Sequence, residues 1–120
     1  MALYDDIGGA PAVRAILDAF YPRVLADPKL SSFFLGVDIE RLKKTQEGFF
    51  AMVLGGPNAY SGRSLQDAHV RTRRRGVSDP EFDHFLAMFK GVLVDRGVPA
   101  GTITECLAIF ESARSQILDR

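Results

Sequence analysis

The chain has 120 residues, a length that favours one domain spanning residues 1–120. Its 15 basic and 15 acidic residues cancel, so no overall charge attracts nucleic acid or an anionic membrane. The single cysteine, Cys106, excludes an internal disulfide and fits a reducing compartment. Because we find neither an apolar N-terminal leader nor an apolar run of membrane-spanning length, we expect a soluble, cytoplasmic protein with no membrane partner.

The first long helix is expected after Gly8-Gly9, near Pro11, a residue suited to a first helical turn. Its apolar residues recur with helical spacing over about four turns. They are Val13, Ile16, Leu17, Phe20 and Val24. Pro22 lies within this stripe and lacks a backbone donor, so we expect a kink beside Tyr21.

A second helix is expected after the apolar corner at residues 33–36. Asp38 is suited to cap its start, and Gly55-Gly56-Pro57 ends it after Leu54. Its stripe contains one polar residue, Gln46, and otherwise consists of Ile39, Leu42, Phe49, Phe50 and Val53. Between residues 58 and 76 the pattern weakens, and only a short helix from about Ser64 to Arg71 is expected.

Two further helices complete the pattern. Pro80 opens the first of them, which Gly97 closes, and the last is expected to begin at a capping box formed by Thr102 and Glu105 and to continue through Ile117. Since no convincing alternating strand pattern is present, the chain is predicted to be an all-α domain in which helices pack on helices.

Two polar residues lie on or beside the apolar stripes. Gln46 shares a helical face with Leu42 and Phe49, where a buried amide without partners costs about 1–3 kcal/mol. Tyr21 lies at the edge of the first stripe, and a buried phenol normally keeps a hydrogen-bond partner. Both side chains can instead reach water from the edge of the core, and the sequence leaves that alternative open.

The chain has two histidines. His84 is two residues from both Phe82 and Leu86, so it points away from the stripe of its helix. His69 has no second ligand at the spacing of a closed zinc site. It is either a structural histidine or the single neutral imidazole, in Phe-rich surroundings, that holds a haem iron. Because no C-x-x-C-H motif is present, such a haem would be bound without covalent attachment, as haem b.

Four stretches of the chain resemble the truncated haemoglobins, and within that family the group I type. They read IGGAPAV, FYPRVLADPKLSSFF, LKKTQEGFFAMVLGGP and YSGRSLQDAH. The double glycines match the helix-breaking pairs of the family, and the resemblance extends from Leu3 to the last helix. It implies a short globin-like fold, a two-over-two helical sandwich around a haem.

Carried over by position, the resemblance also implies residue roles. His69 matches the proximal ligand of the haem iron, while Tyr21 and Gln46 match the distal tyrosine and glutamine. Phe34 matches a phenylalanine that packs on the haem face, and Leu42 stands where many globins carry a distal histidine. The remaining matches are pocket-wall positions at Phe49 and Phe50, the latter at a proposed tunnel gate, and positions near the propionates at Arg41 and Tyr60.

Three features depart from the relatives. Thr45 stands where a basic or histidine residue is common, which removes one expected propionate contact and argues against a second histidine ligand. Pro22 follows the distal tyrosine and bears on the direction of its hydroxyl. The stretch from Arg71 to Asp79 is longer than in some relatives, and the sequence assigns it no role.

The resemblance implies a globin that binds dioxygen at ferrous iron with high affinity and also takes nitric oxide and carbon monoxide. It further implies nitric oxide dioxygenation to nitrate, with a separate reductase because the chain has no flavin or nicotinamide motif. A reversible carrier or sensor of diatomic ligands, without turnover, is the alternative that the sequence leaves open.

A small helical nucleic-acid-binding domain is the alternative outside the haem proteins. It would use the basic residues Arg71, Arg73, Arg74 and Arg75. These arginines follow a short helix, at whose C-terminal end cations are favourable, and no aromatic residues for base stacking are interleaved among them. We therefore expect a helix end and a solvated loop, with no nucleic-acid partner.

Overall fold

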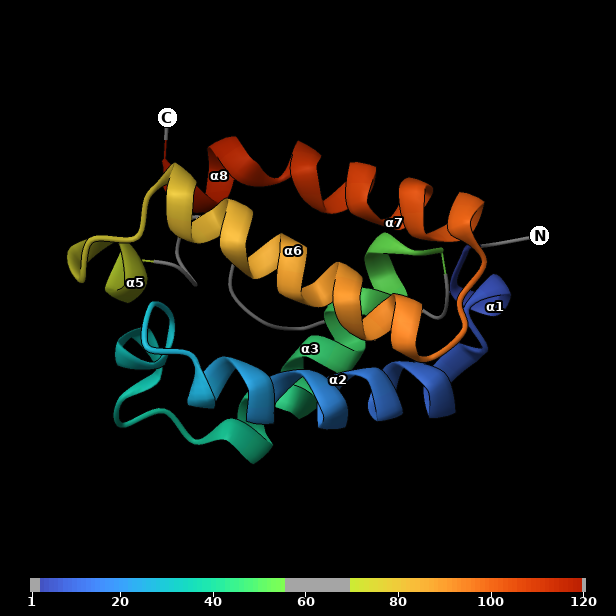
Figure 1. Cartoon of the computed structure of the whole chain (residues 1–120), viewed down its shortest axis with the longest axis horizontal. Helices are drawn as coiled ribbons and strands as arrows, with labels where there is room; N and C mark the ends of the chain where they lie inside the picture. Colours follow the sequence, from blue (N-terminus) through green and yellow to red (C-terminus); the bar gives the residue numbers. More distant parts are fainter. Residues whose placement is uncertain (1–2, 56–69, 120) are drawn as a thin grey trace.

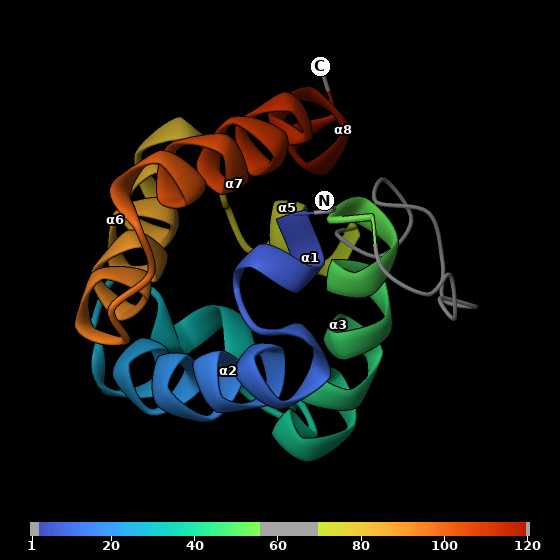
Figure 2. The ribbon, with the colours of Figure 1, turned by 90° about the vertical axis from the view of Figure 1, so that its right-hand side faces the viewer.

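The computed structural model describes residues 3–55 and 70–119, and every regular element in these ranges is helical. The long helices are α2 (Gly9–Ala26), α3 (Ile39–Val53), α6 (Asp79–Asp95) and α7 (Ala100–Ser112). Helix α2 packs against both α3 and α6, and α6 packs against α7. Figure 2 shows the α2–α3 pair beside the α6–α7 pair, so the predicted all-α sandwich of two helices on two is confirmed.

Shorter helices connect and close these layers (Figure 1). They are α1 (Leu3–Asp6), the 3₁₀ helix η1 (Ser31–Phe34), α5 (Val70–Arg74) and α8 (Arg114–Leu118). Within residues 3–55 and 70–119, no helix is both long enough and apolar enough to cross a membrane. The short helix expected from about Ser64 to Arg71 lies mostly outside the described residues, and α5, which begins at Val70, ends at Arg74, beyond the expected end.

The apolar stripe of α2 forms the centre of the core, as its spacing predicts. Helices α6 and α7 contribute the facing residues. The largest fully buried side chains are Val13, Ile16, Leu17, Phe20, Tyr21, Val24, Val92, Leu93 and Cys106. Aromatic rings join the layers edge to face: the Phe20 ring centroid lies 4.9 Å from that of Phe85 and 5.4 Å from that of Phe89.

The ends of the helices follow local rules in most places. Gly8 precedes α2 with φ +114°, and a Cβ there would lie 2.8 Å from the Cβ of Ala12, so only glycine suits this position. The Asp38 side chain accepts the Arg41 N–H at 3.2 Å, which confirms the predicted cap of α3. Helix α2 runs through Pro22 and ends at Ala26.

The predicted start of the last helix is wrong. Helix α7 begins at Ala100, directly after Pro99, and Thr102 lies inside it. The hydroxyl of Thr104 donates to the carbonyl of Ala100 at 3.0 Å, as a threonine within a helix does. The capping box occurs instead at the start of α6, where the Glu81 carboxylate accepts the Ser78 N–H at 2.8 Å.

The last helix is also interrupted, although one continuous stripe through Ile117 was expected. The Ser112 hydroxyl donates to the carbonyl of Ile109 at 2.5 Å, the acceptor that the N–H of Ala113 would use in a continuing α-helix. The Ala113 N–H turns to Phe110 instead, and α8 begins at the next residue, Arg114. The Arg114 guanidinium lies over the Phe82 ring and pairs with Asp79, Asp83 and Glu111, which joins this junction to the start of α6.

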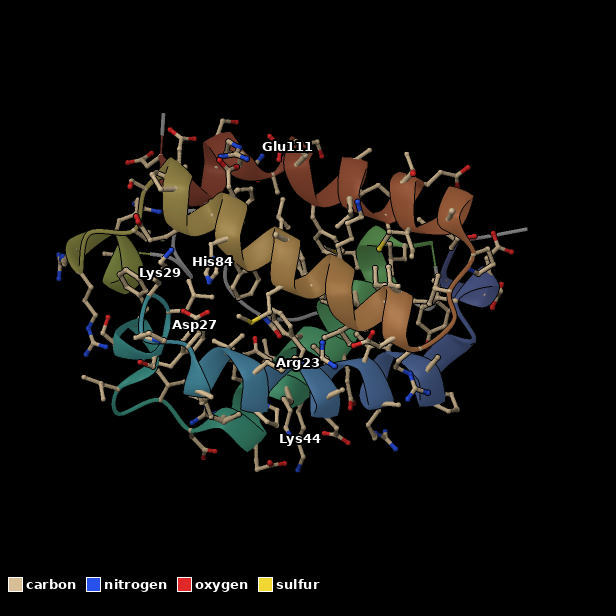
Figure 3. All side chains as sticks on the ribbon, viewed as in Figure 1. Arg23, Asp27, Lys29, Lys44, His84 and Glu111 are labelled. Atoms are coloured by element: carbon tan, nitrogen blue, oxygen red, sulfur yellow. The ribbon has the colours of Figure 1, made fainter. Side chains whose placement is uncertain are left out.

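The end of α2 is joined to α6 by a histidine–carboxylate pair. His84 points toward Asp27, with Lys29 nearby (Figure 3), and His84 Nε2 lies 2.6 Å from Asp27 Oδ2. Because an ionised carboxylate only accepts hydrogen bonds, the histidine nitrogen is the donor. Asp27 Oδ1 accepts the backbone N–H of Lys29 at 2.8 Å. The bond from His84 is the main cause that lowers the pKa of Asp27 below its ordinary value.

A carboxyl whose pKa is lowered by folding stabilises the fold above its ordinary pKa and loses that contribution as the pH falls through the folded value. We therefore expect Asp27→Asn, which keeps an acceptor for Lys29, to lower the melting temperature at about neutral pH. The difference from the unchanged protein should shrink as the pH falls below about 4. Thermal unfolding followed by circular dichroism across this range measures it. The control is Asp6→Asn in α1, and an equal loss at every pH would contradict the role of the Asp27 charge.

Candidate functional site

Tyr21 and Gln46 form a hydrogen-bonded pair between α2 and α3. Only 1% of the Tyr21 surface is exposed, and its hydroxyl donates to Gln46 Oε1 at 2.5 Å. The alternative in which the Tyr21 hydroxyl reaches bulk water is therefore wrong, because the helical stripe of α2 is wider than its aliphatic residues indicate. Gln46 is partly buried, with its amide at the edge of the core. The structure thus joins two residues that lie 25 positions apart.

Burial keeps the Tyr21 phenol neutral. It is the main cause that raises the pKa of Tyr21 well above its ordinary value, and the hydrogen bond with Gln46 opposes this only in part. Tyr21 therefore remains a donor at physiological pH. Since the Gln46 carbonyl oxygen accepts the phenol proton, the amide group keeps two N–H donors, for which no acceptor is found among the described residues.

Phenylalanine rings fix the Tyr21 ring on two sides. The Phe34 ring of η1 lies 5.8 Å from the Tyr21 ring, and the Phe20 ring lies 5.3 Å from it, both edge to face. These contacts restrict the ring to one plane, so the direction of the hydroxyl is set by packing. Phe34, expected at the haem face, is therefore in contact with Tyr21, and both haem-site roles remain predictions.

The other expected pocket residues of α3 occupy different depths. Phe50 is buried, and its ring centroid lies 5.0 Å from that of Phe110 and 5.7 Å from that of Phe89. Phe49 and Leu42 are partly buried and pack against the same core. These contacts place Phe50 between α3 and the α6–α7 layer. Its role as a gate remains a prediction.

Two ion pairs join α2 to α3 beside the Tyr21–Gln46 pair. Arg14 Nε lies 3.0 Å from Glu47 Oε1, and Lys43 Nζ lies 2.8 Å from Asp18 Oδ1. Figure 3 shows these helices with their side chains. One partner of each pair, Arg14 in the first and Asp18 in the second, is well exposed, so water screens the attraction and the pairs add little to stability. Their geometric effect is to hold the two helices in one register.

The remaining predicted site residues differ in what the structure describes. Arg41 is exposed at the start of α3, and its backbone carbonyl accepts the Thr45 hydroxyl at 3.2 Å. His69 and Tyr60 lie outside the described residues, so their roles remain predictions. His69 immediately precedes α5 in the sequence.

The arginines that follow His69 were expected to form a helix end and a solvated loop, which is only half correct. Helix α5 does end at Arg74. However, Arg73 Nη1 donates to the carbonyl of Ile117 at 3.1 Å, and Arg75 Nη1 donates to the carbonyls of Ser32 and Leu35 at 2.9 and 3.3 Å. The sequence carries no signal for these bonds because their acceptors are main-chain atoms.

The described residues fit one side of a haem pocket. A neutral phenol and an amide with free donors lie among phenylalanine rings, which suits an apolar cofactor that carries a small, partly negative ligand. In residues 3–55 and 70–119 there is no group of three or more His, Cys, Asp or Glu side chains placed to hold a metal ion.

Comparison with known proteins agrees with this arrangement. A family model described as bacterial-like globin matches residues 2–119. The group 1 truncated haemoglobin of Mycolicibacterium paratuberculosis is 40% identical over 116 residues, which cover 97% of this chain and 83% of that protein. The group 1 truncated haemoglobin of Tetrahymena pyriformis is 31% identical over 98% of this chain and 95% of its own length.

Solved structures give the same result. The crystal structure of the Tetrahymena pyriformis truncated haemoglobin in its Fe(III) form has a TM-score of 0.91 at 31% identity and covers 98% of both chains. The 2/2 haemoglobin from a Synechococcus species, in the cyanomet state with covalently attached haem, has a TM-score of 0.94 at 31% identity and covers all of both chains.

Proposed function

We propose a function from the premise that this chain belongs to the bacterial-like globin family, within its group 1 truncated haemoglobins. Membership supports a haem-binding globin that binds oxygen. We propose further that His69 is the proximal ligand, that the haem is held without covalent attachment, and that Tyr21 and Gln46 stabilise the bound ligand. The observation that carries this proposal is the buried hydrogen bond between Tyr21 and Gln46.

Haem, when bound, supplies a ferrous iron that takes up dioxygen, nitric oxide or carbon monoxide, and dioxygen bound there acquires partial negative charge. Tyr21 and Gln46 then act as donors preorganised in a site that excludes water. In this arrangement Tyr21 orients Gln46 by donating to its carbonyl oxygen. The amide N–H groups of Gln46 are then the donors left for the ligand. The phenol itself becomes a second donor when its hydroxyl rotates away from Gln46.

His69→Ala tests the proposed haem attachment. We expect the purified protein to have a strong Soret band that is lost or greatly weakened in this variant, because the iron loses its protein ligand. His84→Ala is the matched control, since His84 pairs with Asp27. The visible spectrum measures both variants, and extraction into acidified organic solvent tests non-covalent attachment. A Soret band unchanged by His69→Ala would exclude His69 as the ligand.

Tyr21→Phe and Gln46→Leu test the distal pair. A hydrogen bond to a charged acceptor contributes about 1.5–3 kcal/mol, so Tyr21→Phe should speed dioxygen release by about ten- to a hundredfold. Gln46→Leu should have a smaller effect, because the Tyr21 hydroxyl becomes free to rotate toward the ligand. Stopped-flow displacement of dioxygen by carbon monoxide measures the rates. Unchanged release in Tyr21→Phe would remove Tyr21 from this role.

We propose nitric oxide dioxygenation as the reaction of this site. The overall reaction combines dioxygen, nitric oxide and one electron to nitrate, and a bound haem would supply that electron from its ferrous iron. The donors Tyr21 and Gln46 favour this outcome because slow dioxygen release leaves time for nitric oxide to arrive. A separate reductase must restore the ferrous state, since the chain carries no flavin or nicotinamide motif.

Rapid mixing of the oxygenated protein with nitric oxide tests this reaction. We expect stoichiometric nitrate and oxidation of the protein far faster than its spontaneous oxidation. The control is oxygenated protein mixed with buffer lacking nitric oxide. Oxidation no faster than in this control would leave the reversible carrier or sensor as the function. The nucleic-acid alternative gains no support, because Arg73 and Arg75 bond main-chain carbonyls of the same molecule.

A further inference from the structure

The proposed function leaves the arginines after His69 without a role. Arg73 and Arg75 nevertheless make specific contacts on two sides of α5: Arg73 with Ile117 of α8, and Arg75 with Ser32 and Leu35 at η1. Figure 1 shows α5 at the end of the molecule where η1 and α8 also lie. Arg74, between the two, is exposed and has no side-chain partner among the described residues.

Both arginines place a cation at the carbonyl end of another helix. Ile117 lies in the last turn of α8, and Leu35 directly follows η1. Carbonyl groups in a last turn lack partners within their own helix, and a positive charge is favourable there. Helix α5 itself has five residues, far below the length at which an isolated helix is stable in water. Its position therefore depends on contacts with other elements, and these two arginines provide them.

The contact at η1 leads to the distal pair. η1 carries Phe34 between the two carbonyls that Arg75 holds, and the Phe34 ring packs edge to face on Tyr21 at 5.8 Å. The Tyr21 hydroxyl donates to Gln46. A continuous set of contacts thus runs from Arg75, which directly follows α5, through η1 and Phe34 to Tyr21 and Gln46.

We propose that Arg75 is a positioning residue that couples the segment after His69 to the distal tyrosine, by holding η1 and Phe34 at a fixed place against α5. This inference rests on the proposed function, since it takes His69 as the iron ligand and Tyr21 as a donor to the bound ligand. Loss of the Arg75 bonds lets η1 and Phe34 shift and changes the direction of the Tyr21 hydroxyl.

The bonds of Arg75 suggest a set of matched variants. One nitrogen, Nη1, donates to both carbonyls, so the contact does not use the planar fork that distinguishes arginine from lysine. Arg75→Lys should therefore preserve the contact, whereas Arg75→Met keeps an apolar stem and loses the donors. Arg74→Met removes the same charge one residue away and serves as the control.

In the haem-loaded protein we expect Arg75→Met to speed dioxygen release by about three- to tenfold, the effect of one or two solvent-exposed hydrogen bonds. Arg75→Lys and Arg74→Met should release dioxygen like the unchanged protein. The infrared C–O stretch of the carbon monoxide complex, which reports hydrogen bonding to the ligand independently of release, should shift in Arg75→Met toward its value in Tyr21→Phe. In a Tyr21→Phe background, Arg75→Met should cause no further change.

Equal release rates and C–O stretches in Arg75→Met and Arg74→Met would overturn the inference, as would an effect of Arg75→Met that persists without the Tyr21 hydroxyl. If Arg75→Met does not fold, Arg75→Leu, which also lacks donors, is measured instead, with the same outcomes. Failure of the proposed function is distinct: the unchanged protein would then bind no haem, or Tyr21→Phe alone would leave release and the C–O stretch unaffected.

Discussion

The hydrogen bond from Tyr21 to Gln46 is the interaction on which the site depends. It places a polar contact beside the apolar core, which is tolerated because the phenol donor and the amide oxygen satisfy each other. It also determines which donors remain available for a ligand. The phenol proton of Tyr21 is used in the bond, so the amide N–H groups of Gln46 remain. Helices α2 and α3 pack around this bond. The edge-to-face contacts of Phe20 and Phe34 fix the plane of the Tyr21 ring and so the direction of its hydroxyl.

Hydrogen bonds of Arg73 and Arg75 provide a second constraint, on the segment formed by α5 and Arg75. A run of charged residues usually lies in solvent. The guanidinium groups of Arg73 and Arg75 nevertheless donate hydrogen bonds to main-chain carbonyls of α8 and η1. A five-residue helix that follows the proposed iron ligand is thereby held by bonds rather than by its own core. Aromatic packing positions Tyr21, whereas bonds from Arg73 and Arg75 to main-chain carbonyls hold the segment that follows residue 69.

Local rules predicted much of the architecture, and they failed where two rules competed. The stripe of α2 and the Asp38 cap are short-range features, so the sequence predicted them correctly. The start of α7 was misplaced because Pro99 opens the helix before the apparent cap at Thr102 is reached. The break before Arg114 was missed because it depends on a competition for acceptors, in which the Ala113 N–H bonds to the Phe110 carbonyl and the Ser112 hydroxyl bonds to that of Ile109. A pattern of apolar residues contains no information about that competition.

The sequence by itself determined most of the helices and their buried faces, because helical periodicity is local, and it predicted which residues form the site. Only the tertiary structure decided which polar groups meet. The partners that meet lie far apart in the chain: they are Tyr21 and Gln46, His84 and Asp27, and Arg75 and η1. Their contacts depend on how one helix lies across another, and in the last case on main-chain carbonyls, which every residue possesses and no sequence pattern can mark.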